Sequence, residues 1–151
     1  MIKFVTESTE KVQIASEILQ QLPEWFGLPE STREYITKSK ELPFWAYFEK
    51  AASGFIVLKE TSPYTAEIYV MGVLKEAQRK GVGRALFAEL QAYAKSRGYE
   101  YIQVKTVQKG HYKEYDATNA YYESVGFREL ECFPTLWDEW NPCQIYIKKV
   151  E

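Results

Sequence analysis

The sequence predicts an α/β (α+β) fold, in which helices cover a mixed β-sheet. Short segments rich in β-branched and aromatic residues alternate with segments whose apolar residues recur every three or four positions. In chain order these segments run strand, helix, helix, strand, strand, strand, helix, strand, helix, strand, strand. The strand at 66–73, the helix at 83–96 and the strand at 99–107 follow one another directly. Such a crossover is expected to be right-handed and to leave its two strands parallel.

The first third of the chain supplies one strand and two helices. Residues 2–6 form a short predicted strand, and 10–22 form a helix that the following proline ends. The apolar stripe of that helix consists of Val12, Ile14, Ala15, Ile18, Leu19 and Leu22. Ser31, followed three residues later by Glu34, fits a capping box and predicts a second helix that extends to about residue 39.

The middle of the chain supplies three strands and the longest helix. The predicted strands span 44–49, 51–59 and 66–73. A Thr-Ser-Pro-Tyr turn at 61–64 separates the last two strands. The helix at 83–96 carries apolar residues every three or four positions and ends before Gly98, a residue type common at helix C-termini.

The last third of the chain is predicted as a strand at 99–107, a polar loop at 108–115, a helix at 117–125, a strand at 127–133, a loop at 134–142 and a strand at 143–150. Asp116 is the expected N-cap of the short helix, and Gly126 ends it. The loop at 134–142 holds Trp137 and Trp140.

Length and charge narrow the class of protein. At 151 residues the chain is expected to form one domain, 1–151, whose core needs no disulfide or metal. The formal net charge is −2, and basic residues alternate with acidic ones, which disfavours a nucleic-acid partner. No apolar run reaches the roughly 18 residues of a membrane span, and the first residues do not resemble a signal peptide. We therefore expect a cytoplasmic protein without a membrane partner.

Cysteine and histidine usage predicts no metal. Cys132 and Cys143 lack a C-x-x-C spacing, and His111 is the only histidine. Both cysteines lie on predicted strands and are expected to be reduced, buried apolar residues.

A basic loop joins the strand at 66–73 to the helix at 83–96. Its sequence is Gln78-Arg79-Lys80-Gly81-Val82-Gly83-Arg84. The first N–H groups of a helix have no intrahelical acceptor, and the helix dipole places roughly +0.5 of an elementary charge at that end. The two glycines allow a phosphate to approach the backbone closely, and the three basic side chains add positive charge. The loop is predicted to bind a pyrophosphate; the alternative is a helix-capping turn that happens to be basic.

Two sequence motifs resemble one known family. The dinucleotide and P-loop patterns are absent. Gln78, Gly81 and Gly83 match Q/R-x-x-G-x-G/A, which resembles the coenzyme-A motif of the GNAT superfamily of acetyltransferases. The segment Tyr122-Glu123-Ser124-Val125-Gly126-Phe127 is similar to the other widely recurring motif of that family. The resemblance implies a GNAT-like, mostly antiparallel sheet of six to seven strands, with a splayed parallel pair and about four helices.

The resemblance also implies an acetyl-CoA-dependent N-acetyltransferase and assigns its site residues. Tyr122 matches the general acid of the family, although a core tyrosine is the alternative. The coenzyme would contact Met71, Val73, Gln78, Arg79, Lys80, Gly81, Val82, Gly83, Arg84, Asn119 and Tyr122. The Val73 amide would face the thioester carbonyl. Many relatives carry an asparagine seven residues before the tyrosine; here that position is Tyr115, which leaves Asn119 as the nearest amide.

The reaction requires the acceptor amine to lose a proton. An alkyl amine with a pKa near 10.4 is neutral in about one molecule in 10³ at pH 7, a deficit of roughly 4–5 kcal/mol. Glu67 is the first candidate base, because some members of the resembled family place a catalytic glutamate at this position of the strand. Glu67, Tyr69 and Met71 are expected to share one strand face; a surface carboxylate at the strand entrance is the alternative. His111 on the polar loop, or a chain of waters, is the alternative.

The acceptor is predicted to be the primary amine of a small molecule, acetylated by direct attack. Its pocket would be walled by Trp25, Phe26, Trp45, Tyr47 and Tyr64. Two other functions stay open: acetylation of a protein or peptide amine, and a non-catalytic acyl-CoA-binding sensor. Dimers are common in the resembled family, which leaves a homodimer open.

Overall fold

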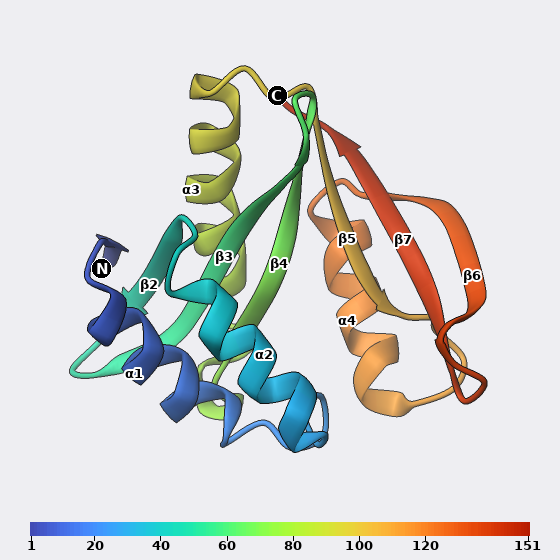
Figure 1. Cartoon of the computed structure of the whole chain (residues 1–151), viewed down its shortest axis with the longest axis horizontal. Helices are drawn as coiled ribbons and strands as arrows, with labels where there is room; N and C mark the ends of the chain where they lie inside the picture. Colours follow the sequence, from blue (N-terminus) through green and yellow to red (C-terminus); the bar gives the residue numbers. More distant parts are fainter.

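A seven-stranded sheet with helices on both faces forms the fold in the computed structural model, which describes residues 1–151 (Figure 1). The strands are β1 Ile2–Val5, β2 Phe44–Phe48, β3 Ala52–Ser62, β4 Thr65–Val73, β5 Tyr101–Val107, β6 Arg128–Asp138 and β7 Asn141–Lys149. The helices are α1 Ser8–Leu19, α2 Pro29–Ser39, α3 Val82–Ser96 and α4 Lys113–Ser124, with a short 3₁₀ helix at Lys75–Ala77.

The sheet has the order β1-β2-β3-β4-β5-β7-β6. The β4–β5 pair is parallel, and every other pair is antiparallel. This confirms the predicted mixed sheet, its parallel pair and the four helices.

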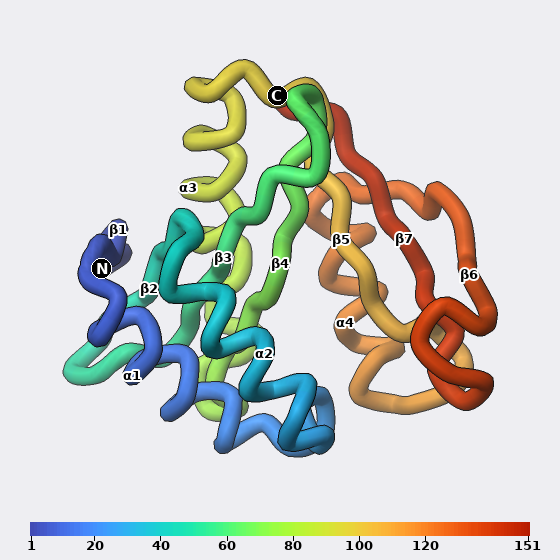
Figure 2. The backbone as a smooth tube through the Cα atoms, in the orientation of Figure 1, coloured from blue at the N-terminus to red at the C-terminus, as the bar shows by residue number.

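Two apolar cores lie on opposite faces of the sheet. Helices α3 and α4 cover one face, and α1 and α2 cover the other (Figures 1 and 2). Leu86 and Leu90, one helical turn apart on α3, are fully buried in the first core. Ile18 and Leu19 of α1 are almost fully buried in the second. Burying each such side chain contributes roughly 1.5–3 kcal/mol, so these helices hold the central strands from both sides.

Helix α2 begins at Pro29, three residues before the start predicted from Ser31 as its N-cap. The capping box of Ser31 and Glu34 is therefore wrong, and α2 has no side-chain cap. Proline suits the first helical position because its φ is already helical and its missing N–H would lack a partner there. Glu34 instead forms an ion pair with Lys38, one turn further along the helix, with 2.9 Å between Glu34 Oε1 and Lys38 Nζ.

Helix α4 begins at Lys113, four residues before the predicted start. Asp116 is not its N-cap, since it lies within the first turn of the helix. Its carboxylate accepts the Gly110 N–H at 2.7 Å and so closes the preceding loop instead.

The predicted loop at 134–142 is wrong, because most of it belongs to the β6–β7 hairpin. Strand β6 continues through Pro134 to Asp138. A proline is tolerated there because β6 is an edge strand. The Asp138 carboxylate accepts the N–H groups of Trp140 and Asn141 at 2.9 and 2.8 Å, which closes the turn.

Gly72 allows α1 to lie close to β4. A Cβ at this position would lie 3.1 Å from Ile18 Cγ2, 3.2 Å from Phe55 Cε1 and 3.3 Å from Leu19 Cδ2. This glycine therefore serves the packing of a helix on the sheet.

Gly72→Ala is expected to lower the free energy of unfolding by about 1–3 kcal/mol, because the added methyl group overpacks the α1–β4 contact. Urea denaturation measures the change. Ile18→Ala opens space at the same contact, so the double variant should lose less stability than the two single variants together. Strict additivity of the two changes would contradict the proposed clash.

Candidate active site

A gap opens in the sheet where β4 leaves β5. The two strands pair only over residues 65–68 of β4, whereas β5 stays paired with β7 to its end. The register of β4 against β3 shifts between Val57 and Leu58, which leaves Tyr69 as an extra residue in β4. Such a bulge bends the strand and increases its twist. Figures 1 and 2 show β4 and β5 close together at one end of the sheet and apart at the other.

The bulge turns Tyr69 and Met71 to opposite faces of the sheet. Met71 packs against the α3 core, and Tyr69 packs against the α1 core. The expectation that Glu67, Tyr69 and Met71 share one face is therefore wrong for Met71. The extra residue resets the two-residue alternation of the strand.

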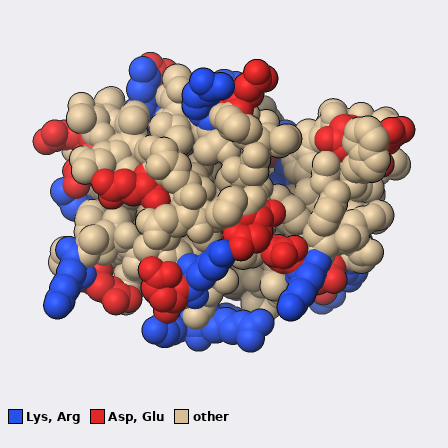
Figure 3. Space-filling view, turned by 90° about the horizontal axis from the view of Figure 1, so that it is seen from below, with Lys and Arg blue, Asp and Glu red and all other residues tan.

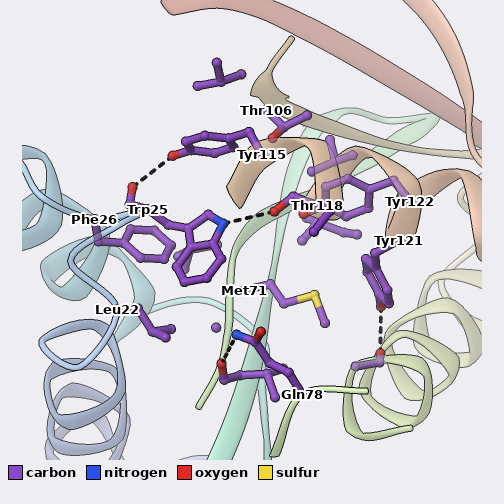
Figure 4. Close-up of a pocket in the computed structure, with 18 of the residues that line it drawn as sticks. Leu22, Trp25, Phe26, Met71, Gln78, Thr106, Tyr115, Thr118, Tyr121 and Tyr122 are labelled. Carbon is purple, nitrogen blue, oxygen red and sulfur yellow. Dashed lines mark hydrogen bonds between the residues drawn. The ribbon is translucent and has the colours of Figure 1, made fainter. Parts of the chain in front are cut away.

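Backbone groups of β4 point into the gap. The Leu74 N–H donates to the Ser53 carbonyl on the β3 side at 2.9 Å. Alternation along the strand directs the N–H groups of Val73 and Met71 to the opposite side, into the gap. The Gln78 side-chain amide donates to the Val73 carbonyl at 2.9 Å and holds this edge of the gap in place (Figure 4).

Six consecutive backbone N–H groups, those of residues 79–84, donate to no acceptor within the protein. The first bonded amide is that of Ala85, which donates to the Gly81 carbonyl at 3.0 Å. Arg79 and Gly81 have positive φ angles of 63° and 83°. Turns of this kind, with successive N–H groups unpaired at a helix N-terminus, form concave sites for anions.

Gly83 allows α4 to pack closely against the start of α3. A Cβ at Gly83 would lie 3.1 Å from Met71 Cε and 3.2 Å from Tyr121 Cε1. The Tyr121 hydroxyl donates to the Gly83 carbonyl at 2.8 Å. At Gly81, by contrast, no atom lies within 4 Å of the built Cβ, and the positive φ explains the glycine.

The gap, the α3 N-terminus and the loop between α1 and α2 enclose a cleft of about 520 Å³ (Figure 4). Its aromatic lining residues are Trp25, Phe26, Tyr35, Tyr69, Tyr115, Tyr121, Tyr122 and Trp137. The predicted coenzyme contacts that line it are Met71, Val73, Gln78, Arg79, Gly81, Gly83, Arg84 and Tyr122. The side chains of Lys80 and Val82 lie outside the lining, and Val82 is buried in the α3 core.

Every charged residue that lines the cleft is basic. These residues are Arg79, Arg84 and Lys105, and no Asp or Glu lines the cleft. Over the face seen from below, acidic and basic side chains are otherwise interspersed, with a row of basic ones along its lower edge (Figure 3). No group of three or more His, Cys, Asp or Glu is placed to hold a metal ion. None of the helices has the length and apolar character needed to cross a membrane.

Tyr122 presents an unpaired hydroxyl to the cleft. Its side chain is buried, with 7% of the residue exposed, and it packs edge-on against Phe127 with ring centroids 5.7 Å apart. No fully buried side-chain polar atom lacks a hydrogen-bond partner. Because the Tyr122 hydroxyl bonds to no protein group, it must keep accessible surface, and Tyr122 lines the cleft. Burial raises the pKa of this phenol above its usual value, so the hydroxyl stays protonated at neutral pH.

Glu67 lies behind the cleft wall and does not line it. The residue is 5% exposed, and its Oε1 lies 3.3 Å from both Gln103 Nε2 and Lys105 Nζ. Its Oε2 has no protein partner and, by the same reasoning as for Tyr122, keeps accessible surface. Burial first, and then the charge of Glu67, raises the pKa of the neighbouring phenol of Tyr35.

Three hydrogen bonds join the α1–α2 loop to α4 across one side of the cleft, and Figure 4 shows those between Trp25 and Thr118 and between Tyr115 and Trp25. The Trp25 indole N–H donates to the Glu114 carbonyl at 3.3 Å and to Thr118 Oγ1 at 3.1 Å. The Tyr115 hydroxyl donates to the Trp25 carbonyl at 2.9 Å. Burial raises the pKa of Tyr115 to about 12, so this donor also persists at neutral pH. Tyr115, the departure from the family pattern, thus helps to close this side.

Three of the five aromatic residues predicted to wall the acceptor pocket lie elsewhere. Trp45 is buried between Phe4 and Tyr93, Tyr47 packs on the α3 core, and Tyr64 is exposed in the β3–β4 turn. Their prediction is wrong because β2 is separated from the gap by β3 and β4, and the β3–β4 turn lies at the closed end of the β4–β5 pair.

Asn119 and His111 are also outside the cleft. The Asn119 amide donates to the Val107 and Tyr115 carbonyls at 2.9 and 2.6 Å and accepts the Tyr146 hydroxyl at 2.6 Å. The predicted coenzyme contact of Asn119 is therefore wrong, since its polar atoms already anchor α4 to the sheet. His111 is exposed, with Nε2 at 3.3 Å from Gln108 Oε1.

Lys105, Thr118 and Trp137 line the cleft and are absent from the predicted site. Signals in the sequence point to the first two of these residues. Alternation in strand 99–107 places Lys105 on the face of Gln103, and Thr118 precedes Tyr122 by one helical turn. Trp137 lacks such a signal, because its segment resembles a loop.

Comparison with known proteins identifies the family. Residues 12–127 match the model of the Acetyltransferase (GNAT) family, and the chain therefore belongs to that family. N-alpha-acetyltransferase RimI of Mycobacterium tuberculosis is 35% identical over 78 residues, which are 52% of this chain and 44% of that protein. The match thus spans less than half the length of that curated relative.

Solved structures with the same fold cover the whole chain. An aminoglycoside 6′-N-acetyltransferase complexed with coenzyme A covers 100% of this chain and 97% of its own, with a TM-score of 0.79 and 16% identity. The ribosomal-protein-S18-alanine N-acetyltransferase from Escherichia coli covers 100% and 95%, with a TM-score of 0.74 and 20% identity. These likenesses show the GNAT fold, and the first shows that a homologue with this fold binds coenzyme A.

Gly83→Asp is expected to abolish the binding of coenzyme A, because it places a carboxylate at the start of α3, next to the unpaired amides. Isothermal titration with coenzyme A measures the affinity. Gly83→Ala is the matched control, since it adds the same crowding against Met71 and Tyr121 without the charge. If the two variants lose affinity equally, the effect is steric and the anion site is not supported.

Proposed function

We propose that this GNAT acetyltransferase transfers an acetyl group from acetyl-CoA to the primary amine of a small molecule by direct attack. The observation that carries the proposal is the row of unpaired amides at residues 79–84, which adjoins a cleft holding the free hydroxyl of Tyr122. The unpaired amides suit the pyrophosphate of a coenzyme, and the hydroxyl of Tyr122 suits its thioester. Both lie along one continuous cleft.

The residues present fit coenzyme A. The amides of 79–84, with the side chains of Arg79 and Arg84, would bind the pyrophosphate. The Met71 and Val73 amides in the gap would bind the extended arm, as strand-edge groups bind peptides. The unpaired donors of this gap are thereby satisfied without any change in the sheet.

When bound, acetyl-CoA supplies the acetyl group: the amine nitrogen bonds to the acetyl carbon and loses one proton, while the carbon–sulfur bond breaks and sulfur leaves with the electron pair. The Val73 N–H, directed into the gap, is the group proposed to stabilise negative charge on the carbonyl oxygen. Tyr122, held protonated by burial, would donate a hydrogen bond or a proton to the departing sulfur.

Glu67 is proposed to take the proton of the amine. Its Oε2 has no protein partner, while its Oε1 is held by Gln103 and Lys105. Since Glu67 lies behind the lining residues, a water molecule would relay the proton across the remaining distance. This route uses the candidate base that lies nearest the cleft, whereas His111 lies outside it.

The closed side of the cleft favours a small acceptor. The bonds of Trp25 with α4 close one side, and Trp137 contributes from the β6–β7 hairpin. The second candidate is a protein α-amine, which the name of the RimI relative suggests. A panel of small amines and short peptides with acetyl-CoA, followed by the release of free thiol, tests the proposal. Binding of acetyl-CoA without turnover over the whole panel would favour the acyl-CoA sensor instead.

Tyr122→Phe should lower kcat about 100-fold or more, because it removes the proposed proton donor and keeps the packing against Phe127. The Kd of coenzyme A should change by less than about threefold, well under 1.4 kcal/mol. Steady-state kinetics and titration calorimetry provide the two values. Tyr112→Phe, which alters an exposed phenol outside the cleft, serves as the control. Unchanged kcat in the Tyr122 variant would remove its assigned role.

Glu67→Gln should lower kcat about 10- to 1,000-fold, because the amide cannot accept the proton of the amine. Its hydrogen bonds with Gln103 and Lys105 can persist through the remaining oxygen. His111→Gln tests the alternative base in parallel. A loss confined to the His111 variant would assign the base to the loop, and no loss in either would assign deprotonation to solvent.

A further inference from the structure

We infer that Lys105 recognises an anionic group of the acceptor, and that the acceptor is an amine carrying a carboxylate and an apolar or aromatic group, as in a free amino acid. This inference rests on the proposed function and names the substrate class of that site. It assigns to Lys105 a role in specificity, separate from the chemistry at Tyr122 and Glu67.

Lys105 is the cation of the cleft that the coenzyme does not account for. Arg79 and Arg84 flank the unpaired amides at the start of α3. Lys105 belongs to β5, on the strand face opposite Ile102 and Val104, which pack in the α3 core. It therefore faces the α1–α2 side of the sheet, together with Tyr69.

In the ion pair with Glu67, Lys105 is the member that lines the cleft. Lys105 Nζ lies 3.3 Å from Glu67 Oε1, yet the side chain of Lys105 is 38% exposed and that of Glu67 only 7%. Lys105 lines the cleft and Glu67 does not, so an acceptor in the cleft meets the lysine side chain first. A carboxylate can bind there beside the buried partner, as a third member of a charge network.

Polycationic amines suit this cleft poorly. None of its lining residues is an Asp or Glu that could pair with further ammonium groups. Each additional unpaired ammonium group would have to give up water near a fixed positive charge. An acceptor with one amine and one carboxylate avoids this cost.

Aromatic rings line the same cleft as Lys105. Phe26 packs edge-on against Tyr35 and Tyr35 against Tyr69, with ring centroids 6.0 and 5.2 Å apart. Trp25 and Trp137 line the same cleft. Such a wall favours an apolar or aromatic group on the acceptor, because its burial stabilises the complex by roughly 25 cal/mol per Å².

Matched acceptor pairs test the inference. Phenylalanine is compared with phenethylamine, and leucine with isopentylamine, so that each pair differs only in the carboxylate; spermidine and kanamycin serve as polycations. The wild-type kcat/KM should be at least tenfold higher for the carboxylate member of each pair, and lowest for the polycations. Lys105→Met should raise the KM for phenylalanine at least tenfold, with little change in the KM for phenethylamine or acetyl-CoA. Because Lys105 also pairs with Glu67, any change in kcat should be the same for both members of an acceptor pair.

Control variants separate recognition from folding. Lys105→Arg keeps the charge and should retain the preference. Lys149→Met removes a basic residue of β7 outside the cleft and should leave all constants unchanged. The double variant Glu67→Gln with Lys105→Met removes both members of the ion pair, so no buried charge is left unpaired. Like Lys105→Met alone, it should lose the binding preference for the carboxylate ligand.

A binding measurement separates this inference from the proposed function. Tryptophan fluorescence, to which Trp25 and Trp137 contribute from the cleft, follows the titration of the protein saturated with coenzyme A, using N-acetylphenylalanine and N-acetylphenethylamine. Tighter binding of the carboxylate ligand that is lost in Lys105→Met supports the inference, even if no amine is acetylated. Absence of acetylation would contradict only the proposed function. Equal binding of the two ligands, a preference that survives in Lys105→Met, or faster acetylation of peptides or polycations would overturn the inference.

Discussion

The parallel pairing of β4 with β5 stops after four residues, and the whole site depends on that stop. A sheet normally pairs its backbone groups, and a buried N–H without a partner costs about 1–3 kcal/mol. Here other local interactions limit this cost. The bulge at Tyr69 turns β4 away, β7 remains paired with β5, and the Gln78 side chain binds the Val73 carbonyl. The N–H groups left in the gap become available to a ligand.

Helix α4 ties the separate parts of the cleft together. Successive residues of this one helix reach the start of α3 through Tyr121, the cleft through Tyr122, and the α1–α2 loop through Thr118 and Tyr115. The helix is itself fixed to the sheet by Asn119. A change in the position of α4 would therefore alter the coenzyme half and the acceptor half together, which explains why so many of its polar groups are bonded.

Periodicity predicted α1, α3 and the central strands because each buries one face, and those faces show in the spacing of apolar residues. The errors lie where two local signals compete. Ser31 and Glu34 suggest a cap, yet Pro29 is a better first helical residue and α2 begins there. Pro134 suggests a loop, yet an edge strand has no partner that needs its missing N–H. Most of the motif residues line the cleft, because their positions depend on backbone conformation at a helix N-terminus, whereas the side chains of Lys80 and Val82 lie outside it.

The sequence by itself determined the family, the order of the elements and the place of the glycine loop at the start of α3, since glycine spacing and helix-terminal signals act over a few neighbouring residues. Only the tertiary structure decided which aromatic residues line the cleft and which groups face them. Met71 and Glu67 point to opposite faces because of one extra residue in β4, a register that depends on β3. Trp25, Lys105 and Trp137 meet at one cleft because three elements far apart in the chain converge on the gap. Such convergence arises from sheet order and strand splay, and these are properties of the folded chain as a whole.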